Sequence, residues 1–229
     1  MNGANRACPI DLVGLCAALA LLAMLPGCSI SDDSNSSTKV NGSIHVAAGK
    51  PAESVATVNG AITVDDSAAV ANAATVNGSV HLGSHAKAES LHSVNGAIGL
   101  DAGAQVSGNA SSVNGELTLG DGADVHGSFS NVNGKISLTS AHVAGGIKTV
   151  NGDISITGAS RVEGGILVQK PSGQITDHDV PVIVIGPGAT VQGELRFERT
   201  VKLYVSDKAT IGTVVGATPI PFSGDNPPS

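Results

Sequence analysis

The chain of 229 residues carries a formal net charge of −7, with 12 lysines and arginines against 19 aspartates and glutamates. It therefore lacks the basic footprint that phosphate backbones require, which excludes nucleic-acid binding as its main role. Aromatic residues make up only 2% of the chain, but 41% of the residues are hydrophobic and 30 are glycine. This composition excludes a disordered chain and favours a thin core of Val, Ile, Leu and Ala.

Residues 1–27 are predicted to be a targeting segment. Arg6 precedes an apolar run over residues 12–25, which at about 14 residues is short for a membrane span. The run ends in Leu25-Pro26-Gly27-Cys28, which resembles the lipobox of bacterial lipoproteins. The resemblance implies that Cys28 is acylated, becomes the new N-terminus and anchors the protein to a membrane. The alternative is an uncleaved N-terminal anchor.

The residues around this segment refine the prediction. Cys8 and Cys16 lie within the part that would be removed, so no cysteine remains for disulfides. Ser29 stands where lipoproteins retained in the inner membrane often carry aspartate, so we expect an outer-membrane lipoprotein that faces the periplasm. Residues 28–39 are polar and aperiodic, which is typical of a flexible tether.

A β-solenoid is predicted over residues 40–216, because the tripeptide Val-Asn-Gly recurs with a nearly constant spacing. Its seven copies follow one another at 18, 18, 18, 19, 19 and 18 residues. Such a period indicates one coil per repeat, stacked on its neighbours. Asn-Gly favours corners where the backbone takes positive φ. The copies begin at Val40, Val58, Val76, Val94, Val113, Val132 and Val150.

Each corner is followed by a short strand with one apolar face, since apolar residues then alternate with polar ones. Eighteen residues divide into three short sides, so we expect an all-β, triangular, single-stranded β-helix of about nine coils. Ala68, Ala104, Ala123 and Ala159 are expected to line its narrow interior. The inward pairs are Ile44/Val46, Ile62/Val64, Val80/Leu82, Ile98/Leu100, Leu117/Leu119, Ile136/Leu138 and Ile154/Ile156.

The rhythm is interrupted once and ends before the chain does. Residues 169–181 contain two prolines and are interpreted as a loop extruded from one coil. The repeat resumes over residues 183–216 without its Asn-Gly corners. Residues 217–229 are rich in proline and are interpreted as a C-terminal tail, in which Phe222 covers the open end of the core.

The stretch Ile183-Val184-Ile185-Gly186-Pro187-Gly188-Ala189-Thr190-Val191-Gln192-Gly193-Glu194-Leu195 looks like the bactofilins, a polymer-forming cytoskeletal family of bacteria. The resemblance extends over residues 40–216. It implies a right-handed triangular β-helix that joins end to end into filaments, serves as a scaffold and has no enzymatic activity or cofactor. The Asn-Gly repeats are also similar to the head domains of bacterial adhesins.

Two polar columns accompany the corners. The asparagines are expected to turn the corners and to stack as a ladder in which each amide donates to the next coil; the alternative is a ligand-binding stripe. The residue before each valine is interpreted as a solvated strand edge, with a polysaccharide-binding surface as the alternative. The first column is Asn41, Asn59, Asn77, Asn95, Asn114, Asn133 and Asn151, and the second is Thr57, Thr75, Ser93, Ser112, Asn131 and Thr149.

No constellation of residues indicates a metal site or an active site. His45 and His81 share a repeat position but lie two coils apart, and the remaining histidines share no column, so no metal is expected. The carboxylates are scattered over different positions of the coil. Only Asp177-His178-Asp179, on the loop, suggests catalysis, and a solvated loop is preferred.

These observations predict a non-enzymatic, membrane-anchored lipoprotein with a β-helix that acts as a scaffold or self-association domain. Its expected partners are the membrane, through the Cys28 lipid, and further copies stacked end to end. The alternative function is a cell-wall or polysaccharide-binding module that resembles an adhesin. No cofactor is expected.

Overall fold

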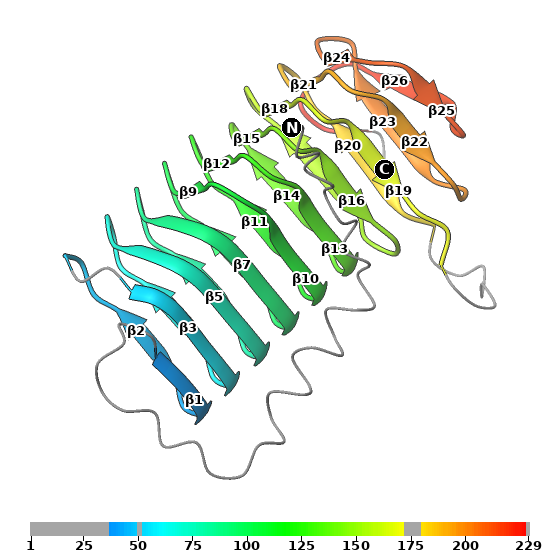
Figure 1. The fold of residues 1–229 in the computed structure, drawn as a ribbon. Coiled ribbons are helices and arrows are strands. Elements are labelled where there is room, and N and C mark those ends of the chain that lie inside the picture. The colour runs from blue at the N-terminus through cyan, green and yellow to red at the C-terminus, as the bar shows by residue number, and fades with distance from the viewer. Residues whose placement is uncertain (1–36, 50–51, 172–179, 228–229) are drawn as a thin grey trace, which may run out of the picture. The chain divides into compact units, whose positions relative to one another are not determined.

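The computed structural model describes residues 37–49, 52–171 and 180–227. The chain divides into two compact units, Met1–Ser34 and Asn35–Ser229, and all described residues belong to the second. This unit is a parallel β-solenoid, in which strands of successive turns lie side by side (Figure 1). The described residues form strands and turns only, and none of them belongs to an apolar helix long enough to cross a membrane.

Face 1 of the solenoid is a ten-stranded sheet whose strands follow one another along the stack. Ten strands correspond to about ten turns, one more than expected, because the last strand forms within the segment 217–229 that was interpreted as a tail. The strands are β2 (Ile44–Val46), β4 (Ile62–Val64), β6 (Val80–Leu82), β8 (Ile98–Leu100), β11 (Leu117–Leu119), β14 (Ile136–Thr139), β17 (Ile154–Thr157), β20 (Val182–Ile185), β23 (Lys202–Ser206) and β26 (Pro219–Phe222).

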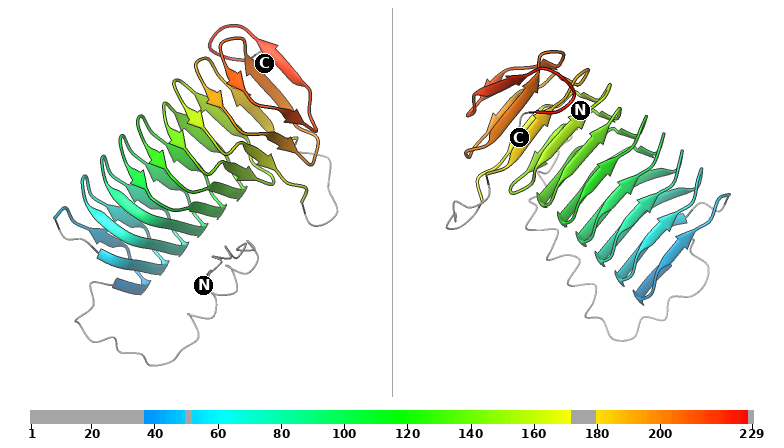
Figure 2. Two further views of the ribbon diagram at one scale, coloured as in Figure 1. Left: turned by 45° about the horizontal axis from the view of Figure 1, so that its top comes forward. Right: turned by 180° about the vertical axis from the view of Figure 1, so that it is seen from behind.

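The second sheet has 16 strands and covers two further sides of the coil. The early turns cover both sides with one long strand, in β3 (Ala52–Asn59), β5 (Ala69–Asn77) and β7 (Lys87–Asn95), and β1 (Ser37–Asn41) pairs with the second half of β3. In later turns the sides are separate strands (Figure 2). Face 2 consists of β9 (Gln105–Val106), β12 (Asp124–Val125), β15 (His142–Val143), β18 (Arg161–Val162), β21 (Thr190–Val191) and β24 (Thr210–Ile211). Face 3 consists of β10 (Ala110–Asn114), β13 (Phe129–Asn133), β16 (Ile147–Thr149), β19 (Ile166–Val168), β22 (Leu195–Phe197) and β25 (Val214–Val215).

One additional residue explains why the long strand divides after β7. Lys87 pairs with Gln105 and Leu91 pairs with Ala110, so the later turn has one residue more between the two pairs. Gly108 occupies the corner that this residue creates, where a β-carbon would lie 2.6 Å from a backbone oxygen of the preceding turn. The same insertion accounts for the first 19-residue spacing of the Val-Asn-Gly tripeptides.

The core confirms the predicted inward pairs, all of which are at most 5% exposed. The interior alanine column is only partly as expected. Ala68, Ala104 and Ala123 are buried, but Ala159 is exposed and Ser160 takes the buried position. The turn before β18 is one residue longer than the turn before β15, which moves the buried position along the chain.

The ends of the described solenoid differ from the expected boundaries. Its first strand begins at Ser37, not at residue 40. Residues 169–171 and 180–181 of the predicted loop form no strand, and residues 172–179 lie outside the described residues. Phe222 is 6% exposed, as expected for a side chain that covers an end, but it belongs to the strand β26. Two prolines do not prevent this strand because β26 is at the edge of its sheet.

Candidate functional site

The predicted asparagine ladder is present along the edge of face 3. Each side-chain Nδ2 donates to the Oδ1 of the asparagine one turn earlier, at 2.8–3.0 Å. The donors therefore point to the preceding turn, opposite to the expected direction. The ladder comprises Asn41, Asn59, Asn77, Asn95, Asn114, Asn133 and Asn151.

An arginine closes the ladder at its C-terminal end. The next turn carries Lys170 in place of an eighth asparagine, so Asn151 Oδ1 has no further amide to accept from. Arg199 follows β22, two turns further on, and donates from Nη1 to this oxygen and, at 3.1 Å, to the backbone oxygen of Val150. The guanidinium thus joins the last laddered turn to a turn without the ladder.

The second polar column is buried, so its interpretation as a solvated strand edge is wrong. Its members are at most 4% exposed and point into the core. Five of the six donate to the backbone oxygen of the corner glycine in the preceding turn, which would otherwise be an unsatisfied buried acceptor. A column that faces the core cannot form a polysaccharide-binding surface. The bonds run from Thr57 to Gly42, Thr75 to Gly60, Ser93 to Gly78, Ser112 to Gly96 and Asn131 to Gly115, at 2.6–3.1 Å.

Two histidines form equivalent pairs with aspartates on face 1. His45 Nε2 lies 2.9 Å from Asp65 Oδ2, and His81 Nε2 lies 3.1 Å from Asp101 Oδ2. The register confirms that the two histidines are two turns apart, with Thr63 between them. Among the described residues, no group of three or more His, Cys, Asp or Glu side chains could hold a metal ion.

A cluster of five charged and titratable side chains, here called the face-2 network, extends over β12, β15 and β18. Asp124 is 3.0 Å from His126 Nε2 and 2.7 Å from His142 Nδ1. His142 Nε2 is 3.5 Å from Glu163, whose Oε1 is 3.1 Å from Arg161 Nε. The carboxylates of Asp124 and Glu163 are therefore linked, not scattered as the sequence suggested.

The sequence contains a signal for this network, which becomes apparent when equivalent positions of successive coils are compared. His142 follows Asp124 by 18 residues, and Arg161 follows His142 by 19, so all three share one position of the coil. Aligning whole coils, instead of single histidines, would have placed these side chains in one column.

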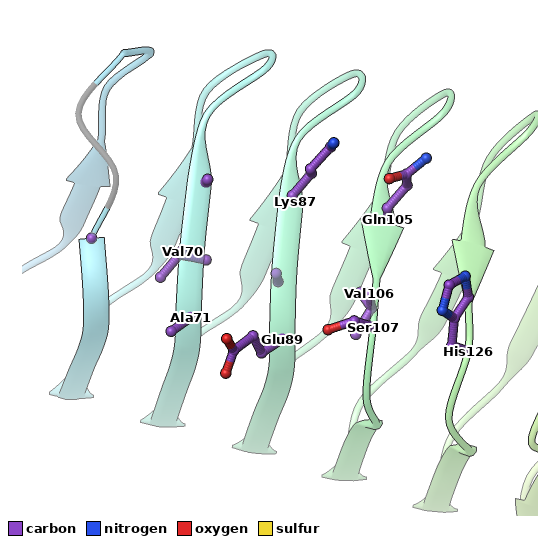
Figure 3. Close-up of a pocket in the computed structure, with 11 residues that line it drawn as sticks. Val70, Ala71, Lys87, Glu89, Gln105, Val106, Ser107 and His126 are labelled. Carbon is purple, nitrogen blue, oxygen red and sulfur yellow. The ribbon is translucent and has the colours of Figure 1, made fainter.

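A groove of about 330 Å³ lies on the outer surface of face 2, beside the network (Figure 3). It runs from the long strands to His126, which belongs to both features. Ala69 and Ala71 leave space for it because their side chains are small. Its polar lining is Lys87, Glu89, Gln105, Ser107 and His126. This mixed lining could hold an uncharged polar chain through single hydrogen bonds.

His92 is the one described side chain with a clearly shifted pKa. Burial lowers the pKa of His92 below its ordinary value of 6.5, because a charged imidazolium loses hydration there. Its Nδ1 lies 2.8 Å from Ser111 Oγ in the next turn of face 3. The neutral ring therefore shares a hydrogen bond between turns in the folded protein.

Other predicted residues have different outcomes. Cys28 and Asp177-His178-Asp179 lie outside the described residues. Arg196 lies 3.8 Å from Glu194 and 3.6 Å from Glu198, so its charge is balanced by two neighbouring carboxylates.

The turns, ladder and buried columns define the class of the protein, a parallel β-solenoid. No protein-family model, curated protein or solved structure matches the chain.

Proposed function

We propose that the protein is a non-enzymatic, membrane-anchored lipoprotein whose β-solenoid is a rigid scaffold of the cell envelope. The observation that carries this proposal is a single core, continuous from Ile44 to Val205, enclosed by parallel strands of every turn. Ten strands in one face give nine intervals of about 4.8 Å, so the rod is roughly 43 Å long. Such a rod fixes the distance between what is attached at its two ends.

The anchor rests on the likeness of Leu25-Pro26-Gly27-Cys28 to a lipobox. The proposed localisation is the outer membrane, with the solenoid in the periplasm. Metabolic lipid labelling and membrane fractionation of Cys28→Ala test it, with Cys16→Ala as the matched control. We expect the label to be lost only in Cys28→Ala; a label retained in that variant would contradict the anchor.

The likeness of residues 183–195 to bactofilins supports a scaffold, but the C-terminal end is poorly suited to end-to-end assembly. On face 1 the first inward residue donates its backbone N–H to the following turn, as Ile62 does to Ser79 at 2.9 Å. Pro219 occupies this position in the last turn, paired with Leu203, and has no N–H. Pro221, paired with Val205, removes the next donor on the same side. Prolines at an exposed edge oppose pairing with another chain.

The N-terminal end carries a second feature that opposes pairing. Lys39 pairs with Thr57 and so occupies the inward column of the first described turn. Its Nζ donates to the backbone oxygen of Ser43 at 2.8 Å. An inward-placed charge is a known protection of sheet edges. Of the two roles expected from the sequence, a scaffold of single rods is therefore favoured over self-association.

Sizing of the Cys28→Ala protein over a range of concentrations distinguishes the two roles. We expect single chains at all concentrations, and association in Pro219→Val/Pro221→Val, which restores both backbone donors. The matched control is Ile220→Thr, which changes the same strand but leaves both prolines. Concentration-dependent filaments of the parent would favour self-association instead.

Binding to a cell-wall polysaccharide is the second candidate function. The buried Thr/Ser column cannot support it, but the groove on face 2 offers the amide of Gln105 and the hydroxyl of Ser107. We expect Gln105→Ala/Ser107→Ala to reduce co-sedimentation with cell-wall material, and Thr118→Ala on face 1 to leave it unchanged. If the parent and both variants co-sediment to the same extent, this candidate function is excluded.

A further inference from the structure

We infer that Asn151 is the Val-Asn-Gly corner at which the folded chain deamidates. In this reaction the backbone nitrogen of Gly152 attacks Cγ of Asn151, the bond from Cγ to Nδ2 breaks and ammonia leaves. Water then opens the resulting succinimide to aspartate or isoaspartate, so no oxidant or cofactor is involved. Glycine favours the attack because it has no β-carbon to crowd its nitrogen.

The fold protects most of the seven corners by engaging this nucleophile. In five corners the glycine N–H donates to the backbone oxygen of the asparagine in the following turn, at 2.9–3.2 Å. That bond must break before the nitrogen can attack, and a net loss of about 1 kcal/mol slows the reaction roughly fivefold. The protected donors are Gly42, Gly60, Gly78, Gly96 and Gly115.

The two remaining corners differ from each other. The sixth is paired with the seventh by an isolated parallel bridge between Asn133 and Asn151, in which the Asn151 N–H donates to the backbone oxygen of Val132 at 2.8 Å. The Gly134 N–H makes no backbone hydrogen bond within the described residues, but Asn133 is only partly exposed. The seventh has no eighth corner to pair with, because Lys170 and Pro171 occupy the equivalent places in the next turn. Within residues 37–49, 52–171 and 180–227, Gly152 N–H makes no hydrogen bond. Asn151 itself is exposed, so water can reach the intermediate.

The product is also best accommodated at this corner. A carboxylate at position 151 would lose the bond from Nδ2 to Asn133, but it would face Arg199, which already donates to Oδ1. A hydrogen bond between a guanidinium and a carboxylate is stronger than one to an amide. Within the ladder, a carboxylate at Asn95 would lose its donation to Asn77 with no cation in its place. Deamidation at Asn151 therefore adds a charged link between the laddered turns and the later ones.

Site-resolved mass spectrometry of the full chain, incubated at mildly alkaline pH, tests the inference. We expect Asn151 to convert at least about fivefold faster than Asn59, Asn77 and Asn95 in the folded protein. In denaturant all seven sites should convert at similar rates, because the local tripeptide is the same. The inference fails if Asn151 does not lead in the folded state, or if its lead persists in denaturant.

Thermal unfolding of two variants tests the accommodation of the product separately. Asn151→Asp should lower Tm less than the matched Asn95→Asp, because only the former faces Arg199. If Tm decreases by the same amount in both variants, Arg199 does not accommodate the carboxylate and this part of the inference is overturned.

Discussion

The turns with an asparagine ladder and the turns after it differ in the residue that occupies the inward position before the corner. In the laddered turns the inward position before the corner is polar, as in Thr75, and satisfies a glycine carbonyl of the preceding turn. In the later turns the same position is occupied by Val168 and Phe197, and no Asn-Gly corner is present. A polar residue at this inward position therefore accompanies an Asn-Gly corner in its own turn, and an apolar residue replaces it in turns without one.

The boundary between the two regions shows the same dependence. Thr149 is the last polar member of the column, and its Oγ1 is buried without a hydrogen-bond partner among the described residues. It pairs with Val168, the first apolar member. The hydroxyl at this position is therefore expected to contribute little to stability, in contrast to the hydroxyl of Thr75.

The largest effect is expected from disrupting a corner of the laddered region. A β-carbon on Gly96 would lie 1.9 Å from the backbone oxygen of Gly78, which cannot move away. Gly96→Ala should lower the free energy of unfolding by about 3 kcal/mol or more, as measured by chemical denaturation. Gly99→Ala is the control, because its β-carbon would meet only the His81 ring, at 3.5 Å. Equal losses in both variants would contradict the close approach at the corner.

Introducing a hydroxyl at the inward column position of the later turns should have the next largest effect on stability. Phe197 is buried, and the turn before it carries Pro171 in place of a corner glycine. Phe197→Thr would bury a hydroxyl with no corner glycine to donate to, so we expect it to lose roughly 2 kcal/mol more in the free energy of unfolding than Phe197→Val, which has the same shape without the hydroxyl. Equal denaturation midpoints in the two variants would show that the later turns accept a polar column, and the distinction between the regions would fail.

The reverse change should cost less and depend on the turn. Thr75→Val removes the 3.1 Å donation to Gly60 and should lower the free energy of unfolding by about 1 to 2 kcal/mol. Thr149→Val, the matched variant at the boundary, should be neutral or slightly stabilising because its hydroxyl has no partner. Thermal and chemical unfolding check both, and a larger loss in Thr149→Val would reverse the argument.

The smallest effect concerns the pH dependence of the laddered region. Because burial lowers the pKa of His92 in the folded state, the unfolded chain binds this proton more readily. The contribution of His92 to stability is therefore complete above its ordinary pKa of 6.5 and is lost as the pH falls below it. His92→Ala introduces the residue that stands at the equivalent position of the preceding turn, Ala74. The free energy of unfolding of this variant should depend less on pH below 6.5 than that of the parent. A profile identical to that of the parent would contradict the assignment.

The repeat spacing and the alternation after each corner were sufficient to predict the solenoid and its inward pairs. They were insufficient for Thr75 and its equivalents, because alternation alone would place the neighbouring valine inside. The valine is instead partly exposed and the threonine buried, since the glycine carbonyl needs a donor. The prolines of β26 were misjudged because a strand at the edge of a sheet can lack donors that an inner strand needs.

The face-2 network was missed for a related reason. Its contacts between turns join residues 18 or more apart, such as Asp124 and His142, and they become visible only when insertions within each coil are aligned. The additional residue in the turn before β18 shifts that alignment within the network itself. The position of Arg199 was not predictable, because it follows turns that lack the Asn-Gly repeat.

The central claim is that each 18-residue repeat is one turn, with equivalent asparagines stacked in adjacent turns. Paired cysteines test it most directly, in a chain with Cys8, Cys16 and Cys28 replaced by Ala. We expect Asn77→Cys/Asn95→Cys to form a disulfide readily on mild oxidation, because adjacent turns lie about 4.8 Å apart. Asn59→Cys/Asn95→Cys, two turns apart, should remain reduced. Failure of the first pair to cross-link, or equal cross-linking of the second, would contradict the stacking on which the scaffold depends.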